Sequence, residues 1–198
     1  MAKRKNNEKY QRIIAAATKV FARKGFYQSK ISEIAKEAQV ADGTIYIYFE
    51  NKDDILISLF EEEIGNLIEQ VTGALQTITD PRKKLEIFAL HHLGLVEENR
   101  ELAEVLQVEI RQSNIFQNGY RNQKFAEYLD IIFAIIQEGQ EQGLFRTDVN
   151  LNLMKRIYFG ALDESSRLWI QSAEHDMSIA ETALQICDLF LSGITRRA

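Results

Sequence analysis

Apolar side chains recur every three or four residues along most of this 198-residue chain, with polar residues between them. That spacing places the apolar side chains on one face of an α-helix. In residues 8–24, for example, Ile13, Ala17 and Phe21 share such a face. Gly25 follows at a position where a glycine commonly ends a helix. The pattern therefore predicts an all-α fold.

The same spacing predicts further helices, joined by short turns. A short helix follows Ser29, and the others cover 42–48, 52–78, the stretch that begins at Asp80 and Pro81, 101–112, 121–142, 151–172 and 178–192. Asp80 and Pro81 are typical of a helix start, because Asp caps free N–H groups and Pro lacks an N–H that would be unpaired there.

Composition agrees with a helical protein of a reducing compartment. The chain has one Pro and 10 Gly, fewer turn-forming residues than a rich β fold needs. The single cysteine, Cys187, excludes an internal disulfide and fits a reducing cytosol. No uncharged run approaches the roughly 20 residues of a membrane span, and no apolar segment follows the basic Lys3 to resemble a signal peptide. We therefore expect a cytoplasmic protein that does not enter a membrane.

Charge is distributed unevenly along the chain. The net charge is -5, but residues 1–52 carry 11 Lys and Arg against 5 Asp and Glu, whereas the remainder carries 13 against 24. A basic end joined to an acidic body is typical of nucleic-acid binding, although an ordinary solvated helix face gives similar counts.

The short helix after Ser29 and the helix over 42–48 form a candidate DNA-binding motif. They are joined by a tight turn and preceded by the basic helix 8–24, and together these elements make a helix-turn-helix arrangement. In such a motif one helix enters the major groove while neighbouring groups contact phosphates. Gly43 and Thr44 are small enough for a close approach to DNA. We therefore predict an N-terminal three-helix DNA-binding domain over 1–52 and a C-terminal helical-bundle domain over 53–198.

The segment from about Tyr10 to Phe60 resembles the TetR family of bacterial transcriptional repressors. The residues that carry the resemblance are Gly25, Phe26, Ile31, Ile34, Ala35, Ala38, Val40, Gly43, Thr44, Ile45, Tyr46, Tyr48, Phe49 and Lys52. Within that family, residues 41–60 resemble the fatty-acid-degradation regulators called FadR, and residues 109–114 add weaker support.

The resemblance implies a repressor that binds palindromic double-stranded operator DNA as a homodimer. Residues 53–198 would then hold the ligand-binding and dimerisation functions. For a FadR-like member, the resemblance further implies release from DNA by a long-chain acyl-CoA and control of fatty-acid-degradation genes.

The resemblance and the geometry of the motif together suggest the DNA contacts. Gly43 and Thr44 would approach base edges, Ser32 could face the groove, and surrounding hydroxyls and amines would hold phosphates. For Tyr46 and Tyr48, partial core packing is the alternative. The candidate DNA-binding residues are Ser29, Lys30, Ser32, Asp42, Gly43, Thr44, Tyr46, Tyr48 and Lys52.

Two positions depart from the family pattern. Gln39 stands where Gly is usual in the turn, which costs about 1 kcal/mol if the turn needs a positive φ. Ala41 stands where Ser or Thr usually caps the second helix, unless Asp42 caps it by shifting the helix start by one residue.

The candidate ligand site consists mainly of apolar positions within 53–198. They are Phe88, His92, Leu95, Leu106, Ile110, Arg111, Phe125, Leu129, Phe133, Phe159 and Trp169. An apolar pocket with a few polar groups suits an acyl chain, and the same residues suit a dry core. The basic residues available for CoA phosphates are Arg100, Arg111, Arg121, Lys124 and Arg167. No cofactor is expected, and the regulatory ligand implied by the resemblance is a long-chain acyl-CoA.

The two last helices carry apolar stripes that suit helix–helix packing. The stripes are Leu151, Met154, Tyr158, Ala161, Ser165 and Leu168 in the first helix and Ile179, Ala183, Ile186, Phe190 and Ile194 in the second. They form either an intramolecular core or, as the resemblance implies, a four-helix dimer interface. A dimer would place two recognition helices ~34–36 Å apart, on successive major grooves.

The sequence offers no catalytic or metal-binding constellation. His91 and His92 are adjacent, so they point ~100° apart on a helix, and neither has a second ligand three or four residues away. We therefore predict a DNA-binding regulator and not an enzyme. Three alternatives stay open: a repressor of an efflux gene that senses another lipophilic compound, an acyl-CoA-handling enzyme, and a helical interaction module.

Overall fold

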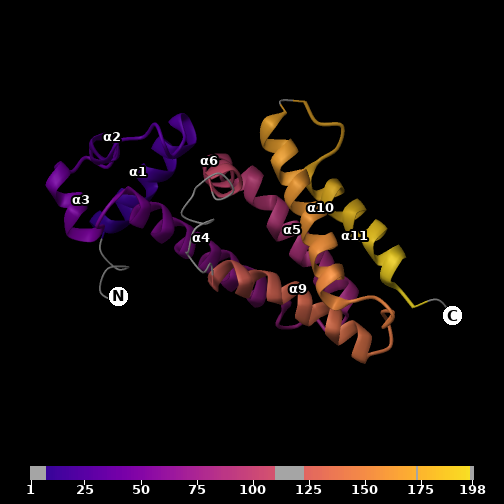
Figure 1. The fold of residues 1–198 in the computed structure, drawn as a ribbon. Helices are drawn as coiled ribbons and strands as arrows, with labels where there is room; N and C mark the ends of the chain where they lie inside the picture. Colours follow the sequence, from indigo (N-terminus) through magenta and orange to yellow (C-terminus); the bar gives the residue numbers. More distant parts are fainter. Residues whose placement is uncertain (1–7, 110–122, 173, 197–198) are drawn as a thin grey trace. The chain divides into compact units, whose positions relative to one another are not determined.

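A computed structural model of the chain describes residues 8–109, 123–172 and 174–196, and these residues form helices joined by turns (Figure 1). The elements are α1 (Glu8–Lys24), α2 (Ile31–Glu37), α3 (Asp42–Tyr48), α4 (Lys52–Leu75), α5 (Pro81–Glu98), α6 (Arg100–Glu104), the π-helix η1 (Val105–Glu109), α9 (Gln123–Glu141), α10 (Leu151–Gln171) and α11 (Ile179–Ile194). Within these described residues the β-structure is limited to one isolated bridge between Phe145 and Thr195. The predicted all-α fold is confirmed.

The chain divides into two compact units. The N-terminal unit comprises Met1–Glu63 and Glu101–Arg121, and the C-terminal unit comprises Ile64–Arg100 and Asn122–Ala198. The long helix α4 therefore contributes residues to both units. A domain boundary between residues 52 and 53 stays a prediction.

The N-terminal unit is built around the apolar face of α1. Ile13, Ala17 and Phe21 are buried on this helix, as the sequence spacing predicts. Ile34 of α2 and Ile45 of α3 are fully buried as well. Because α2 packs against both α1 and α3, one small core holds the three helices together.

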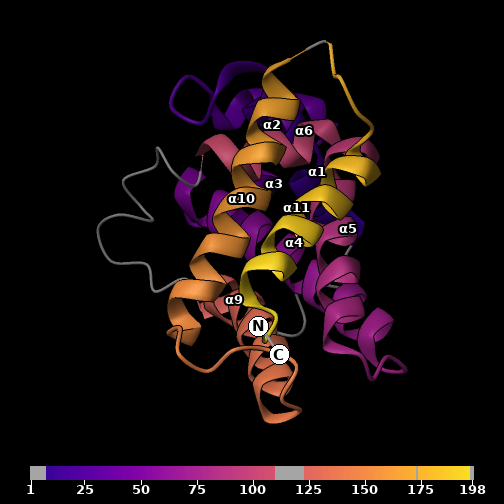
Figure 2. The ribbon, with the colours of Figure 1, turned by 90° about the vertical axis from the view of Figure 1, so that its right-hand side faces the viewer.

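The C-terminal unit is organised around α5. This helix packs against α9, α10 and α11, and α10 and α11 lie side by side (Figure 2). The hydroxyl of Tyr158 on α10 donates a hydrogen bond of 2.7 Å to the carbonyl of Leu85 on α5. A buried polar group is thus satisfied at the contact between the two helices.

The helix ends follow the signals in the sequence. Asp80 is the N-cap of α5, its side chain accepts a bond from the Arg82 N–H, and Pro81 is the first helical residue. Gly25 follows α1 directly and Gly143 lies two residues after the end of α9, and they take positive φ angles of 75° and 71°. These left-handed conformations are the reason that glycine ends both helices.

The stretch 101–112 differs from the expected single α-helix. From Val105 to Glu109 the chain is a π-helix, in which each hydrogen bond spans one residue more than in an α-helix. The predicted continuation to residue 112 lies outside the described residues.

The apolar stripes of α10 and α11 also differ from a pure dimer interface. Met154, Tyr158 and Ala183 are buried within the chain, and the rings of Tyr158 and Phe190 lie 4.6 Å apart. These side chains form an intramolecular core because α10 and α11 pack on α5 and on each other. Other large apolar side chains of the two helices are exposed, namely Leu153, Ile157, Leu168, Leu184 and Leu189.

Among the described residues, no helix combines the length and the apolar character that crossing a membrane requires.

Candidate DNA-binding surface and effector site

The turn between α2 and α3 is held in a strained conformation. Gln39 has a φ of 54°, in the left-handed region, so the condition under which Gln costs energy at this position is met. One Nη of Arg12 on α1 donates to the carbonyls of Ala38 and Gln39, the latter at 3.1 Å. Arg12 thereby fixes the turn that sets the direction of α3.

Helix α3 begins without a side-chain cap. Ala41 is the N-cap, with an extended backbone, and no side-chain hydrogen bond closes this helix end. Asp42 already belongs to the helix, so the alternative in which Asp42 caps α3 is wrong. Free N–H groups at a helix start are available to an anion such as a phosphate.

The outer face of α3 is open. Asp42, Gly43 and Tyr46 are exposed there, and Thr44 is half-buried. A Cβ placed on Gly43 would meet no atom within 4 Å, so none of the described residues fills the space in front of it. The structure thus brings these four predicted DNA-binding residues together on one short helix.

Ile47 joins the same outer face, and sequence reasoning missed it. Its side chain is 69% exposed, an unusual state for an isoleucine. The signal available in the sequence was its position four residues after Gly43, which places both on one side of a helix.

The predicted DNA contacts at the start of α2 differ in their exposure. Lys30 and Ser32 are exposed, as phosphate or groove contacts require. Ser29 is only 3% exposed, and its hydroxyl donates a 2.7 Å hydrogen bond to the carbonyl of Gly25. A phosphate contact through that hydroxyl would break this bond, so the structure favours a role for Ser29 in shaping the loop after α1.

Lys52 has partners inside the N-terminal unit. Its ammonium donates to the carbonyls of Phe26 at 2.6 Å and Ser29 at 2.9 Å, and lies 4.4 Å from the centre of the Phe26 ring. These contacts bind the first residue of α4 to the loop between α1 and α2. The predicted phosphate contact of Lys52 stays untested, and its intramolecular role was not visible in the sequence.

Tyr48 is half-buried against aromatic neighbours. Its ring meets the ring of Tyr10 edge-on, with the centres 6.3 Å apart. This geometry agrees with the partial core packing considered for Tyr48, whereas Tyr46 is 58% exposed and faces outward.

An aromatic cluster occupies the interior of the C-terminal unit, at the predicted effector site. We use this name for Phe88, His92, Phe125, Tyr128 and Phe159. Phe88 and Tyr128 stack with ring centres 4.9 Å apart, and Phe159 meets both His92 and Phe125 edge-on, at 5.4 Å and 5.3 Å. Four of the predicted ligand-binding residues are thus in one continuous group.

Burial changes the ionisation of the polar members of the cluster. The pKa of His92 is lowered from 6.5 to about 4, because desolvation disfavours the charged ring. The pKa of Tyr128 is raised well above its ordinary value for the same reason. Both side chains are therefore neutral at physiological pH.

The remaining predicted ligand residues lie elsewhere or are less enclosed. Leu95 and Leu129 are half-buried. The ring of Phe133 has the ammonium of Lys155 at 5.4 Å from its centre. The ring of Trp169 stacks on that of His175, with the centres 3.6 Å apart. Leu106 belongs to the N-terminal unit. Ile110 and Arg111 lie outside the described residues.

Three of the basic residues considered for CoA phosphates lie in the described part of the chain, and each has a partner within the protein. Arg100 donates to the carbonyl of Ile170 at 2.5 Å, Arg167 to Glu164 at 2.8 Å, and Lys124 forms an ion pair of 2.8 Å with Glu127. Arg121 lies outside the described residues. Any phosphate bound by Arg100, Arg167 or Lys124 would compete with these partners.

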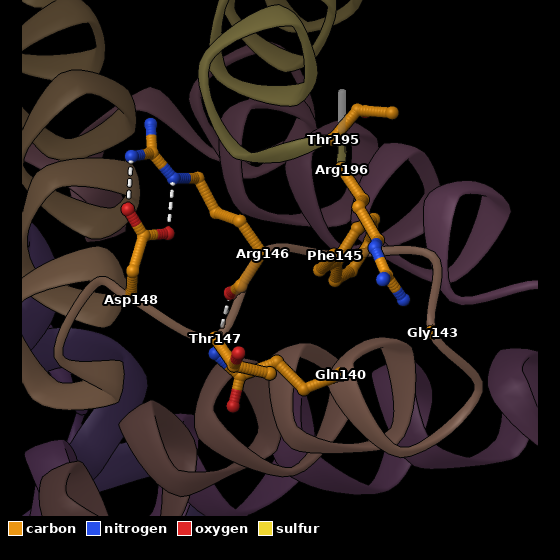
Figure 3. Close-up of a pocket in the computed structure, with 8 residues that line it drawn as sticks. All are labelled: Gln140, Gly143, Phe145, Arg146, Thr147, Asp148, Thr195 and Arg196. Atoms are coloured by element: carbon orange, nitrogen blue, oxygen red, sulfur yellow. Dashed lines mark hydrogen bonds and ion pairs between the residues drawn. The ribbon is translucent and has the colours of Figure 1, made fainter. Parts of the chain in front are cut away.

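A separate pocket of about 460 Å³ lies where the end of α9 meets the end of α11 (Figure 3). It is lined by Gln140, Gly143, Phe145, Arg146, Thr147, Asp148, Thr195 and Arg196. Arg146 donates to Asp148 at 2.7 Å, and Gln140 donates to the Arg146 carbonyl at 2.8 Å (Figure 3). No predicted ligand-binding residue lines this pocket, and its polar groups largely bond one another.

Within residues 8–109, 123–172 and 174–196, no three His, Cys, Asp or Glu side chains are grouped so that they could hold a metal ion.

Comparison with known families covers nearly the whole chain. Residues 13–59 match the family described as bacterial regulatory proteins of the tetR family. Residues 60–193 match the family described as the C-terminal region of YsiA-like protein. The two matches meet between residues 59 and 60.

Similar proteins, two of them of known structure, match nearly the whole chain. The chain is 37% identical over 186 residues to a fatty acid metabolism regulator protein of Bacillus subtilis, covering 94% of this chain and 95% of the relative. The fatty acid degradation regulator FadR of Bacillus halodurans has a TM-score of 0.88 at 36% identity, covering 98% of this chain and 100% of that one. FadR of Bacillus subtilis in complex with stearoyl-CoA has a TM-score of 0.86 at 36% identity, covering 93% and 99%. With its helix-turn-helix, its helical C-terminal unit and these matches, the chain belongs to the TetR family of bacterial transcriptional regulators.

Proposed function

We propose that this protein is a repressor that binds operator DNA through the outer face of α3 and the N-terminus of α2. The observation that carries the proposal is the open face formed by Gly43, Tyr46 and Ile47. Three exposed groups on a short helix after a tight turn suit insertion into a major groove. Phosphate contacts by Lys30 and Tyr46 would hold the helix in register.

The proposed repressor is a homodimer. The exposed apolar side chains of α10 and α11 supply an interface, and Leu189 at 75% exposure is its most open member. A Cβ placed on Gly160 of α10 or on Gly193 of α11 would meet no atom within 4 Å, so a second copy could approach closely there. Two α3 helices on one particle would read the two halves of a palindrome.

The proposed effector is a long-chain acyl-CoA, and the genes controlled are those of fatty-acid degradation. Support comes from the FadR relatives, one of which binds stearoyl-CoA, and from the aromatic cluster in the same C-terminal unit. An aromatic interior with few polar groups suits a long hydrocarbon chain. We also place the protein in the cytoplasm, where it meets chromosomal DNA.

Release from DNA follows from unequal binding. The acyl-CoA must prefer a conformation in which the two α3 helices do not match successive grooves, since a ligand shifts an equilibrium only by its differential affinity. Helix α4 contributes residues to both units and is one of the covalent connections through which this change could pass.

A titration tests the proposal. Operator complexes of the full chain, formed on DNA from the promoter of a fatty-acid-degradation operon, are titrated with stearoyl-CoA and, separately, with free stearate and CoA. We expect release by stearoyl-CoA at concentrations at which CoA alone has no effect. Release by unrelated lipophilic compounds but not by stearoyl-CoA would contradict the proposed effector, and absence of operator binding would contradict the proposed repressor.

A further inference from the structure

His92 is a polar side chain set among aromatic rings, and one of its nitrogens is unpaired. The residue is 9% exposed, and its Nδ1 lies 3.0 Å from the hydroxyl oxygen of Tyr128. Its Nε2 is buried and has no hydrogen-bond partner among the residues that the structure describes. Because nearly all buried polar atoms in folded proteins have a partner, such an atom requires an explanation.

The Tyr128 contact determines which nitrogen carries the proton. If the Tyr128 hydroxyl donates to Nδ1, only the Nε2–H is left unsatisfied. If Nδ1 donates instead, both the Tyr128 O–H and the Nε2 lone pair lack partners. The first arrangement leaves fewer unsatisfied groups and is therefore favoured, so Nε2 is a hydrogen-bond donor without an acceptor.

The surroundings restrict the acceptor to a neutral group. Phe88 lies nearly parallel to the His92 ring, and Phe159 meets it edge-on, so these neighbours offer at most a weak contact to an N–H. Burial keeps His92 uncharged, with a pKa lowered to about 4. A neutral donor among aromatic rings does not compensate the burial of a carboxylate or a phosphate.

The aromatic cluster offers a route to this nitrogen. Phe88 is fully buried, whereas Phe125 and Phe159 retain part of their surface. Phe159 borders the His92 ring edge-on, so a ligand that displaces Phe159 would reach the ring of His92 in an otherwise apolar environment. A long-chain acyl group has the matching chemistry, since its hydrocarbon tail is apolar and the carbonyl at its head is a neutral acceptor.

We propose that the Nε2–H of His92 donates a hydrogen bond to the thioester carbonyl of the bound acyl-CoA and so fixes the depth of the acyl chain. This inference rests on the proposed function, because it takes an acyl-CoA as the effector. It makes His92 a positioning and recognition residue that distinguishes an acyl thioester from a plain hydrocarbon chain.

The test compares two ligands that differ in that carbonyl alone. Stearoyl-CoA is the thioester, and S-stearyl-CoA is the thioether with a CH₂ in place of the carbonyl. Binding of each to the full-length protein is measured by calorimetry. One neutral hydrogen bond predicts that the wild type binds the thioester roughly threefold to tenfold tighter.

Variants locate the difference at His92. In His92→Leu the preference for the thioester should vanish, because the donor is gone while the apolar volume remains. In His92→Gln, whose amide N–H₂ reaches the position of Nε2, the preference should return. His91→Leu is the matched control, since it removes the adjacent histidine of the same helix and should leave the preference unchanged.

The outcomes separate the two proposals. An equal affinity of the wild type for both ligands, or a preference that survives in His92→Leu, would overturn the role of His92 while leaving acyl-CoA as the effector. If neither ligand bound to the wild type, the proposed effector itself would fall, and the role of His92 with it. The comparison on the wild type stands even if His92→Leu does not fold.

Discussion

The ammonium of Lys52 lies 2.6 Å from the carbonyl oxygen of Phe26, so the first residue of α4 is bound to the loop that precedes α2. The further bond from Lys52 to the carbonyl of Ser29 adds to this link. Helix α4 and the DNA-binding motif are therefore linked by hydrogen bonds from one side chain to backbone carbonyls.

Replacing Lys52 should weaken the fold of the N-terminal unit. For Lys52→Met we expect the free energy of unfolding in urea to fall by about 1–3 kcal/mol, because charged hydrogen bonds to buried carbonyls are lost. Lys36→Met, at an exposed position of α2, is the control and should change it little. If Lys52 acted only on phosphate, stability would stay constant and the salt dependence of operator binding would lose a slope of about 1.

Gln39→Gly should stabilise the protein. The left-handed φ of 54° costs a residue with a Cβ, and glycine adopts it freely. The expected gain is about 0.5–1 kcal/mol in urea unfolding, after the greater flexibility of glycine in the unfolded chain is deducted. Gln28→Gly, at an exposed loop position without a positive φ, should lose stability instead. Equal effects of the two substitutions would show that the turn is not strained.

Gly139→Ala should be strongly destabilising. A Cβ on Gly139 would overlap the ring of Phe145, which is fully buried and cannot withdraw into solvent. Overpacking of this kind typically costs about 1–3 kcal/mol. The matched control is Gly94→Ala in α5, where no atom lies within 4 Å of the new Cβ. Since alanine favours helices over glycine, Gly94→Ala should hold or raise the melting temperature, whereas Gly139→Ala lowers it.

Acid should destabilise the C-terminal unit through His92. Its pKa in the folded protein is about 4, against 6.5 in the unfolded chain, so between these values the unfolded state binds the additional proton. Stability is therefore retained above about pH 6.5 and lost as the pH falls toward about 4, by about 3 kcal/mol in total. Urea unfolding of the wild type and of His92→Gln at several pH values measures the difference. Parallel curves for the two proteins would show that His92 does not titrate in this way.

Leu189→Lys should convert the proposed dimer into monomers. A charged side chain would have to be buried without a partner in the proposed apolar interface, to which the exposed Leu189 contributes. We expect sedimentation equilibrium to give the monomer mass and operator affinity to fall by at least tenfold. Gln137→Lys, an exposed position on α9, is the control and should leave both unchanged. A dimer that persists in Leu189→Lys would place the interface elsewhere.

The positions of the helices and of the DNA-binding motif could be predicted because their signals are local. Apolar spacing along α1, the cap at Asp80 and the glycine at position 143 each act within a few residues. The resemblance of residues 10–60 to the TetR family rests on the same short-range pattern, and the full-length relatives bear it out.

Which apolar side chains of α10 are buried within the chain was decided only by the tertiary structure. Tyr158 and Ile157 are neighbours on α10, yet Tyr158 is buried against α5 and Ile157 is exposed, because packing partners come from distant segments. The same holds for the carbonyls bound by Lys52 and for the unpaired nitrogen of His92. The sequence by itself determined the helices and the family, since periodicity and caps are local properties. The long-range packing decided which buried polar atoms have hydrogen-bond partners and which do not, since those partners come from segments that only the fold brings together.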